Sequence, residues 1–596
     1  MDKLKIIRQA VEQGRLDYSQ ITLARYLLQL HADVSEYCLQ LAVLVNQEIK
    51  QGNVCLRVDD IAPRSEALLR TTLSDVETVI QSSPIIGGRD DKRPLVYDLN
   101  KLYLSRYFYY EQQLAQRLLA LVNTSRPVQK IAAESLQQLF NSQENPDYQK
   151  IAAVISSHHQ LCIISGGPGT GKTRTVSQLL ALLLQQNPQL NIKLAAPTGK
   201  AAARLSQSIQ QSRVQMMHDL FVEQQIPDKA ITLHRLLGIH RYTHRPRYHA
   251  DNPLNCDVLV LDEASMIDQQ MMAMVCEALP EQARLILLGD KDQLSSVEAG
   301  SVFADLCGEL KVTQFSKAQC QWIKRTLDYM VPEYRGNYRL ADQVVVLQKS
   351  YRFEGDSAIG QLARLINSGD SEGCLQFLMT SQATAQMQWQ QPSDQQLTEQ
   401  LMQQVIQHYQ PIIEADNIKQ AFDCFYRFQI LAAIWEGVSG VDAINHVIQQ
   451  ALKRHNKIPA DSLYYAGMPL MMSSNMYQYG IHNGDIGIVW LDDNDQLKVW
   501  FEADDGSHRA LSLSQLPQSK PAYAMTVHKS QGSEFDRVLM ILPNYDSSVC
   551  TRELLYTGIT RARDSVEIWG LGGVIESAVE RKTERVSGLL ERLSTL

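Results

Sequence analysis

The chain contains a glycine-rich run ending in lysine and threonine, a pattern that can hold the phosphates of a nucleotide. The run follows an apolar stretch at 161–165 and precedes a helical pattern, so it would join a strand to a helix. Backbone N–H groups of such a loop can surround phosphate oxygens at the start of the helix. We expect lysine to neutralise the β- and γ-phosphates and threonine to bind Mg²⁺. The residues are Gly166, Gly167, Pro168, Gly169, Thr170, Gly171, Lys172 and Thr173.

Two carboxylates and an amide follow later apolar stretches. Asp262 and Glu263 come directly after the stretch 258–261, and Gln293 follows the stretch 285–288. Ligands bind at the carboxyl ends of strands in open α/β sheets. We therefore expect Asp262 to hold Mg²⁺ through water and Glu263 to polarise the attacking water. Gln293 is placed to contact the γ-phosphate, and an ordinary turn at the end of a strand is the alternative.

Short apolar stretches alternate with helical stretches on both sides of these motifs. This alternation predicts a doubly wound α/β domain, and further stretches at 429–433, 525–527, 538–542 and 566–569 predict a second one. Between 455 and 515 the strands are short and separated by tight-turn residues, which predicts a small inserted β-barrel. The glutamine-rich stretch 381–404 is interpreted as a linker or an exposed helix.

The order of the motifs resembles that of superfamily 1 DNA helicases. After the glycine-rich loop come Thr198-Gly199-Lys200, Thr232-Leu233-His234, Asp262-Glu263, Gly289-Asp290 with Gln293, Ser350-Tyr351-Arg352, Thr526-Val527-His528-Lys529 and Thr560-Arg561. Their spelling resembles one family of the 5′-to-3′ group, the RecD family, which supplies the alpha subunit of exodeoxyribonuclease V in RecBCD complexes. The resemblance extends over nearly the whole chain.

The resemblance implies a fold and a division into domains. It implies an α/β fold with two RecA-like P-loop motor domains, a helical N-terminal domain and a small inserted SH3-like β-barrel. The expected boundaries are 1–115 for the N-terminal docking domain, 116–335 for the first motor domain with an inserted hairpin near 239–256, 336–454 and 516–596 for the second motor domain, and 455–515 for the barrel.

The resemblance also assigns roles in nucleotide binding and hydrolysis. Gln149 would read the adenine base, because its amide can both donate and accept; a solvated surface glutamine is the alternative. Arg352 and Arg561, expected on the second motor domain, would reach the γ-phosphate across a cleft and stabilise charge in the transition state. Closure of the cleft would then depend on the nucleotide.

DNA contacts are expected from loops beside the predicted strands. Short hydroxyl, imidazole and ammonium groups suit phosphate contacts, which position DNA without reading its sequence. The expected residues are Pro197, Thr198, His234, Thr526, His528 and Lys529. A basic and aromatic stretch at 240–249, with Arg241, Arg245 and Arg247, suits single-stranded DNA through charge and stacking; a solvated loop is the alternative.

Length and composition limit the class of protein. With 596 residues the chain exceeds one packed core, and 44% hydrophobic with 20% charged residues is an ordinary globular balance. The net charge of −8 requires any nucleic-acid surface to be local. No apolar run reaches the roughly 18 residues of a membrane helix, so no membrane partner is expected. Ten cysteines without a CxxC pair indicate a reduced, cytoplasmic chain.

These observations predict an ATP-dependent 5′-to-3′ DNA helicase subunit with ATP and Mg²⁺ as cofactors. By resemblance it would act on single-stranded DNA and duplex ends, in a heterotrimer with RecB-like and RecC-like subunits, in double-strand break repair and recombination. Nuclease activity would reside on the RecB-like partner. A stand-alone superfamily 1 helicase and a non-motor P-loop NTPase are the alternatives.

Overall fold

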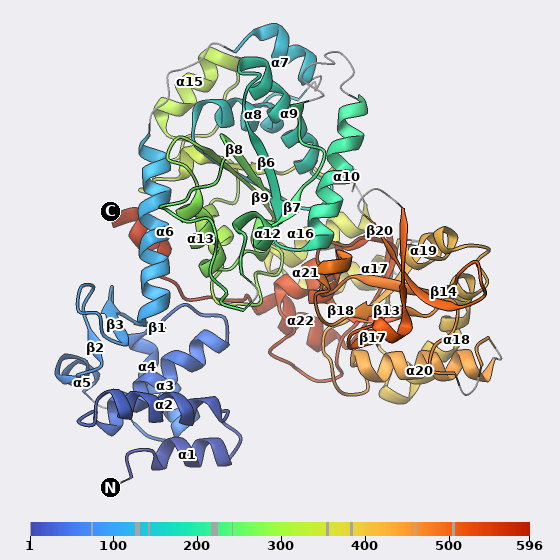
Figure 1. The fold of residues 1–596 in the computed structure, drawn as a ribbon, viewed down its shortest axis with the longest axis horizontal. Coiled ribbons are helices and arrows are strands. Elements are labelled where there is room, and N and C mark those ends of the chain that lie inside the picture. The colour runs from blue at the N-terminus through green and yellow to red at the C-terminus, as the bar shows by residue number, and fades with distance from the viewer. Residues whose placement is uncertain are drawn as a thin grey trace.

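Three parts follow one another in the fold. The computed structural model describes residues 2–72, 75–124, 131–140, 144–215, 225–240, 242–352, 357–381, 386–455, 457–459, 462–503 and 507–595. An N-terminal part leads through a long helix into a first sheet flanked by helices, and a second sheet lies to the other side with an antiparallel sheet attached (Figure 1).

The N-terminal part combines helices with a small sheet, whereas the sequence predicted helices alone. Four strands form a sheet in the order β1-β4-β3-β2, which lies between the helices of this part and α6 (Figure 1). Apolar residues of α3, among them Leu39, Leu41 and Leu44, are buried in the core of this part. The elements are α1 (Lys5–Glu12), α2 (Ser19–Leu30), α3 (Glu36–Lys50), β1 (Leu56–Arg57), α4 (Ile61–Leu69), α5 (Val76–Ser82), β2 (Ile86–Gly87), β3 (Leu95–Asp98) and β4 (Lys101–Leu104).

The first large sheet has six parallel strands in the order β10-β5-β9-β8-β6-β7. Helices cover both of its faces. Its strands are β5 (Leu161–Gly166), β6 (Ile192–Ala196), β7 (Ile231–Thr232), β8 (Val258–Leu261), β9 (Arg284–Gly289) and β10 (Val344–Leu347). Its helices are α6 (Ser105–Asn123), α7 (Ala133–Leu139), α8 (Tyr148–His158), α9 (Lys172–Gln186), α10 (Gly199–Gln215), α12 (Leu233–Leu237), α13 (Gln269–Ala278), α14 (Val302–Cys307) and α15 (Lys317–Leu327).

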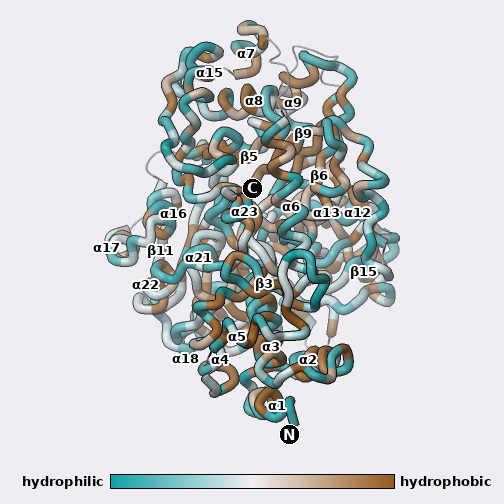
Figure 2. The backbone as a smooth tube through the Cα atoms, turned by 90° about the vertical axis from the view of Figure 1, so that its left-hand side faces the viewer, coloured by the Kyte–Doolittle hydropathy of each residue, from teal (hydrophilic) through white to brown (hydrophobic). Residues whose placement is uncertain are grey.

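Alternate residues of each central strand enter two different cores. Leu259 and Leu285 pack on one face of the sheet, and Val260 and Ile286 pack on the other. All are buried, because side chains of a strand point alternately to its two faces and both faces are covered. This explains the continuous apolar stretches in the sequence, which appear as hydrophobic strands inside the molecule in Figure 2.

The second large sheet has five parallel strands in the order β11-β20-β19-β12-β18. The strands are β11 (Met387–Gln390), β12 (Phe428–Ala432), β18 (Ala524–Thr526), β19 (Phe535–Ile541) and β20 (Ala562–Trp569). The helices are α16 (Ala358–Ser368), α17 (Ser371–Ser381), α18 (Asp394–Ile413), α19 (Ile418–Arg427), α20 (Val441–Arg454), α21 (Arg552–Ile559) and α22 (Gly572–Glu580). In its described part the glutamine-rich stretch is no linker: it supplies edge strand β11, with buried Trp389, and the first half of α18, a helix with one exposed side as the alternative expected.

An antiparallel sheet is inserted between β12 and β18. Its order is β16-β15-β14-β13-β17, with β13 (Pro469–Met472), β14 (Ile486–Leu491), β15 (Leu497–Glu502), β16 (His508–Ser512) and β17 (Ser519–Pro521). Ile488 and Val499 of this sheet share one continuous core with Ile430 and Leu539 of the second parallel sheet. The two sheets are thus packed as a unit.

Two expected domain boundaries need correction. Strand β10 pairs with β5, so the first sheet extends beyond the boundary expected at 335/336. Helix α6 runs without a break through the boundary expected at 115/116. Turn residues and apolar stretches alone do not reveal which strand a given stretch pairs with, and this pairing decides the boundary.

The end of the chain also departs from the expected division. Residues after α22 leave the second sheet, and α23 (Leu589–Thr595) packs against α6 (Figures 1 and 2). The N–H of Val54 donates to the carbonyl of Val586 at 2.8 Å, and Arg592 donates to Glu111 at 2.8 Å. Residues 516–596 therefore do not all belong to the second motor domain, since this last segment joins the N-terminal part to the first sheet.

Across the described ranges, every helix is too short or too polar to cross a membrane.

Candidate active site

The glycine-rich loop lies between β5 and α9, as the sequence predicted. Lys172 Nζ donates to the carbonyls of Gly166 and Gly167 at 2.6 and 3.2 Å, so its ammonium group lies over the loop. Gly169 has a φ of +77°, and a Cβ there would lie 2.3 Å from Cβ of Arg352. Only glycine fits both the backbone angle and this close approach. The loop therefore presents N–H groups and one ammonium group at the start of a 15-residue helix.

Gln149 lies next to this loop. Its side-chain Nε2 donates to the carbonyl of Thr170 at 3.0 Å. Asp147, which caps the start of α8, accepts from the backbone N–H of Gln149 and thereby helps to fix the residue. Gln149 is thus placed beside the loop and is not a freely solvated glutamine, while its contact with adenine stays a prediction.

Asp262 and Glu263 lie at the carboxyl end of β8 beside the loop. Burial and the neighbouring Glu263 raise the pKa of Asp262 to about 6, and Lys172 opposes this shift. Glu263 has a φ of 51°, a left-handed conformation that costs a non-glycine residue energy. The backbone N–H of Glu263 donates to Oδ1 of Asp262 at 2.9 Å and stabilises this turn. This left-handed turn places two successive carboxylates at the carboxyl end of β8.

Gln293 and Arg561 join the two parallel sheets. Arg561 Nη2 donates to Oε1 of Gln293 at 2.8 Å, and both side chains are buried. Gln293 in turn donates to Asp290 at 2.9 Å, and the same carboxylate accepts from the hydroxyl of Tyr556 on α21 at 3.0 Å. Burial lowers the pKa of Arg561 and raises that of Asp290. The chain of hydrogen bonds connects the end of β9 directly to α21 and β20.

The neighbouring residue Leu294 strengthens this connection. Its N–H donates to the hydroxyl of Thr557, and its carbonyl accepts from the side chain of Gln531, both at 2.9 Å. Movement of the second sheet would therefore be transmitted to the segment that follows β9.

Arg352 approaches the loop from the first sheet. It follows β10, and the preceding residue Tyr351 donates its N–H to the carbonyl of Gly169 at 2.8 Å. We expected Arg352 on the second motor domain together with Arg561; only Arg561 comes from that sheet. The reason is again the pairing of β10 with β5, which keeps this segment beside the loop.

Glu534 forms ion pairs with three arginines. It binds Arg352 at 2.8 Å and Arg563 at 3.3 Å, and it also pairs with Arg204 of α10. Burial disfavours the charged carboxylate, but Arg204 and Arg352 outweigh burial and hold the pKa of Glu534 well below its usual range. We did not single out Glu534, Arg204 or Tyr556 from the sequence. Each lies four or five residues from a motif quoted above, which was the available signal.

Residues expected to contact DNA lie along the facing edges of the two sheets. Thr198, next to Pro197, accepts from the N–H of Ala201 at the start of α10, and His234 is exposed on α12. In the second sheet Thr526 accepts from the N–H of Lys529, beside half-buried His528. The inserted sheet bridges the two groups.

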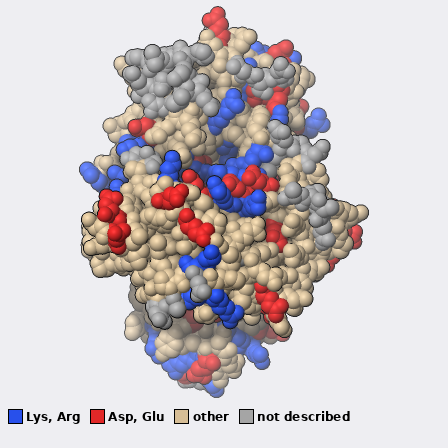
Figure 3. All heavy atoms as spheres, turned by 90° about the vertical axis from the view of Figure 1, so that its right-hand side faces the viewer, with Lys and Arg blue, Asp and Glu red and all other residues tan. Residues whose placement is uncertain are grey.

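That bridge is made by the turn before β14. A Cβ on Gly199 would lie 2.3 Å from Cδ2 of His482, and Lys529 Nζ donates to Oδ1 of Asn483 at 3.2 Å. Lysines and arginines gather around a hollow on this side of the molecule, with acidic residues among them (Figure 3).

The basic stretch at 240–249 forms an exposed loop after α12. Its described residues make turns, with His240 donating its N–H to the carbonyl of Arg245 at 2.9 Å, and one isolated bridge between His249 and Asn252. No paired strands are found among them, so the described part of the expected hairpin is a turn-rich loop. Arg245 and Arg247 are exposed, and Arg247 lies over the ring of Tyr248. Arg241 lies outside the described residues.

The donor groups beside the loop fit a magnesium ion. The Thr173 hydroxyl at the start of α9 and the Asp262 carboxylate at the end of β8 are hard oxygen donors of the kind that Mg²⁺ prefers. Desolvation raises the pKa of Asp262 because it disfavours the charged carboxylate, and a bound cation would stabilise that charge. Elsewhere, within the described residues, no three His, Cys, Asp or Glu side chains gather as a metal site would require.

Three family models match separate parts of the chain. Residues 149–299 match an AAA domain, residues 521–568 match a UvrD-like helicase C-terminal domain, and residues 12–103 match the N-terminal domain of RecBCD enzyme subunit RecD. RecBCD enzyme subunit RecD of Haemophilus influenzae is 31% identical, with 100% of this chain and 99% of that protein aligned. The corresponding subunit of Mycolicibacterium smegmatis is 35% identical, with 97% of each protein aligned.

The chain belongs to the RecD family. Its motifs, from the glycine-rich loop to Arg561, are therefore those of a RecD protein. The ATP-dependent RecD2 DNA helicase of Deinococcus radiodurans is 27% identical over 73% of this chain but only 50% of its own length. RecD membership thus rests on nearly full-length similarity, and similarity to RecD2 is confined to a part of that protein.

Proposed function

We propose that this chain is the ATP-dependent DNA helicase subunit of a RecBCD-type enzyme that acts in DNA repair and recombination in the cytoplasm. The observation that carries the proposal is the buried hydrogen bond between Arg561 and Gln293, which joins the two parallel sheets beside the nucleotide loop. Because this hydrogen bond lies beside the nucleotide loop, binding and hydrolysis of the nucleotide can change the position of the second sheet relative to the first. Family membership supplies the reaction and the assembly.

The two parallel sheets would act as RecA-like motor domains and the inserted sheet as an SH3-like barrel. ATP would bind at the loop, with Lys172 at the β- and γ-phosphates and Gln149 at the base. Mg²⁺ held by Thr173 and Asp262 would neutralise phosphate charge. Glu263 would orient and deprotonate the attacking water. Arg561 and Arg352 would stabilise the charge that develops on the γ-phosphate. Gln293 would contact the γ-phosphate and lose this contact when the phosphate leaves.

Single-stranded DNA would cross the facing edges of the two sheets. Thr198 and His234 would contact it on one side and Thr526, His528 and Lys529 on the other, all through phosphates. Each cycle of closure and opening would then move one group of contacts relative to the other. By family resemblance the movement is 5′-to-3′. The RecB-like and RecC-like subunits would bind the duplex end, and the nuclease activity would reside on the RecB-like subunit.

A stand-alone helicase is the second candidate. The match of residues 12–103 to the RecD N-terminal domain and the alignment with only half of the RecD2 helicase favour the subunit. A non-motor NTPase is disfavoured, because such a protein has no need of arginine contacts between two α/β sheets.

Unwinding of tailed duplexes tests the proposal. The full chain with ATP and Mg²⁺ should unwind a duplex with a 5′ overhang and leave one with a 3′ overhang intact. Lys172→Gln should abolish unwinding and DNA-stimulated hydrolysis, because a charge needed at the phosphates is lost. Lys150→Gln is the matched control, since Lys150 lies on α8 outside the loop. Unwinding from 3′ tails would refute the polarity, and full hydrolysis by Lys172→Gln would refute the nucleotide site.

A further inference from the structure

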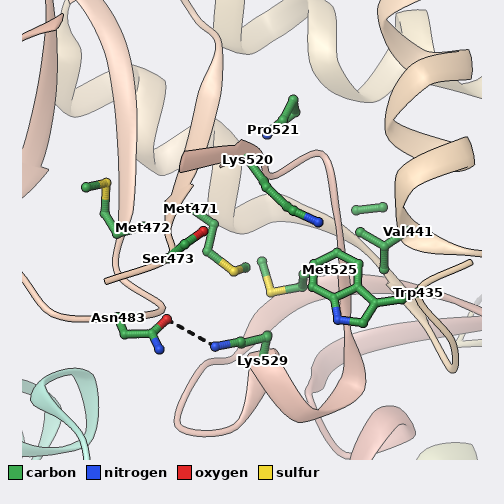
Figure 4. Close-up of a pocket in the computed structure, with 11 residues that line it drawn as sticks. Trp435, Val441, Met471, Met472, Ser473, Asn483, Lys520, Pro521, Met525 and Lys529 are labelled. Atoms are coloured by element: carbon green, nitrogen blue, oxygen red, sulfur yellow. Dashed lines mark hydrogen bonds between the residues drawn. The ribbon is translucent and has the colours of Figure 1, made fainter. Parts of the chain in front are cut away.

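A small cavity opens where the second parallel sheet meets the inserted sheet. Its volume is about 200 Å³, and Trp435, Met471, Met525, Lys520 and Lys529 line it. Figure 4 shows the two methionine side chains side by side between the lysines and the indole of Trp435. The cavity therefore combines one aromatic ring, an apolar floor and two ammonium groups.

Trp435 is held in place although its ring is exposed. It follows β12, and its carbonyl accepts from the N–H of Asp442 at 3.3 Å, while the carbonyl of Ile434 accepts from Val441 at 3.1 Å. Both donors belong to the first turn of α20. Trp435 is 39% exposed as a residue, an unusual state for a large aromatic side chain on so firmly fixed a backbone. A ring presented in this way is available to a ligand.

The ring already carries a cation. Lys520 Nζ lies 4.2 Å from the centre of the indole and 3.4 Å from Oδ1 of half-exposed Asp442. This weak ion pair leaves the ammonium group within reach of a phosphate. Attraction between a cation and an indole face places positive charge beside a surface on which a base can stack.

The cavity continues the proposed DNA path. Strands β12 and β18 are parallel neighbours, with Ala432 opposite Thr526, so Trp435 and Lys529 follow the same edge of the sheet. Lys529 also reaches Asn483 in the turn that contacts the start of α10. A strand running from Thr198 to Lys529 would therefore reach the cavity next.

We propose that this cavity holds one base of the single-stranded DNA, stacked on Trp435, with the adjoining phosphate bound by Lys520. The volume lies below the roughly 300–1,000 Å³ of pockets that enclose a drug-sized molecule, so it suits a single ring system. The Met471 and Met525 floor offers contact without base-specific hydrogen bonds, which makes the site tolerant of sequence. The inference rests on the proposed function and adds a base contact to a path otherwise built on phosphates.

The test compares an ordinary oligonucleotide with one of equal length that lacks bases. Trp435→Ala in the full chain should weaken binding of the ordinary strand about fivefold or more, since stacking on an aromatic ring contributes ~1–3 kcal/mol per base. Binding of the abasic strand should be unchanged. Trp435→Phe should retain most of the affinity because it keeps an aromatic face. Lys520→Gln should weaken both strands and reduce the salt dependence of binding by about one phosphate contact.

Tyr545→Ser is the matched control. Tyr545 is 58% exposed, and its neighbour Asn544 contacts Pro392 and Asp394 at the start of α18, on the β11 side of the sheet and away from β18. Equal weakening of both strands by Trp435→Ala, or no weakening of either, would overturn the base site. So would a loss confined to assembly with partner subunits, which would make the cavity a protein contact. Failure of the wild-type chain to bind single strands or to show DNA-stimulated hydrolysis would instead refute the proposed function.

Discussion

The two carboxylates at the end of β8 differ in environment and should differ in role. Asp262 is half-buried, and desolvation and the neighbouring Glu263 raise its pKa to about 6, whereas Glu263 occupies a left-handed turn next to it. We predict that Glu263→Gln lowers the rate of ATP hydrolysis by about 10²–10⁴-fold, the usual contribution of a general base, with little change in nucleotide affinity. Asp262→Asn should instead raise the Mg²⁺ concentration needed for activity.

Single-turnover hydrolysis and direct nucleotide binding separate these effects. A large loss of nucleotide affinity in Glu263→Gln, matching its loss of rate, would show that Glu263 is itself a metal ligand. Glu277→Gln serves as a control carboxylate on helix α13, which packs against the same sheet but lies outside the loop.

Gln293 and Arg561 should act as a pair. Removing either leaves one buried polar atom of its partner, Oε1 of Gln293 or Nη2 of Arg561, without this hydrogen bond, which costs about as much as removing both. We predict that Gln293→Ala, Arg561→Ala and the double variant show similar losses of DNA-stimulated hydrolysis. A double-mutant cycle of kcat measures this coupling, and losses that multiply would contradict it.

At the scale of elements, helix α23 fixes the last segment to α6 through a buried ion pair. Arg592 and Glu111 are 2% and 0% exposed, and Asp98 also binds Arg592 at 2.6 Å. Arg592→Met should lower the free energy of unfolding by about 3–5 kcal/mol, because Glu111 would remain buried and charged.

The neighbouring ion pair provides a matched comparison for that variant. Lys101 binds Glu591, whose side chain is 53% exposed. Glu591→Gln should cost less than Arg592→Met, since the exposed Glu591 carboxylate is partly screened by water and the glutamine oxygen can still accept from Lys101, whose side chain is 7% exposed. Denaturant unfolding measures both variants. Equal costs for Arg592→Met and Glu591→Gln would contradict the assigned importance of burial.

The sequence predicted the positions of strands and loops better than it predicted which strands pair and which distant segments pack together. Strand stretches such as 258–261 and the loop at 166–173 lie where their patterns indicate, because side-chain periodicity and glycine content are local properties. The strand pairing of 344–347 and the return of 586–592 to α6 depend on contacts with residues far away in the chain. For the same reason Lys172 and Asp262 could be predicted together, while the gathering of three arginines, the expected Arg352 among them, around Glu534 could not.

At the scale of the whole molecule, the N-terminal part presents large exposed apolar side chains suited to a protein partner. Tyr26 and Leu30, one helical turn apart on α2, are 57% and 48% exposed. We predict that replacing both with serine leaves DNA-stimulated hydrolysis of the isolated chain intact but weakens assembly with RecB-like and RecC-like subunits. Gln51→Ser, at an exposed position after α3, is the control.

Coexpression with both partners and isolation of the complex measure this outcome. Stoichiometric assembly of the Tyr26 and Leu30 double variant would place the docking surface elsewhere. Deleting residues 1–115 would be a poorer test, because it also removes Asp98 and Glu111 and so destabilises the first sheet through Arg592.

The return of the last segment to α6 has a consequence for synthesis on the ribosome. Glu111 is made 481 residues before Arg592, its buried partner. At about 5–20 residues per second, Glu111 waits roughly half a minute to a minute and a half for that partner. During this time the nascent first half cannot complete its packing, so it is exposed to chaperones and proteases. A ribosome that stalls or terminates early leaves a chain whose nucleotide loop is complete but whose fold is not, and the cell can remove it before it competes for DNA ends.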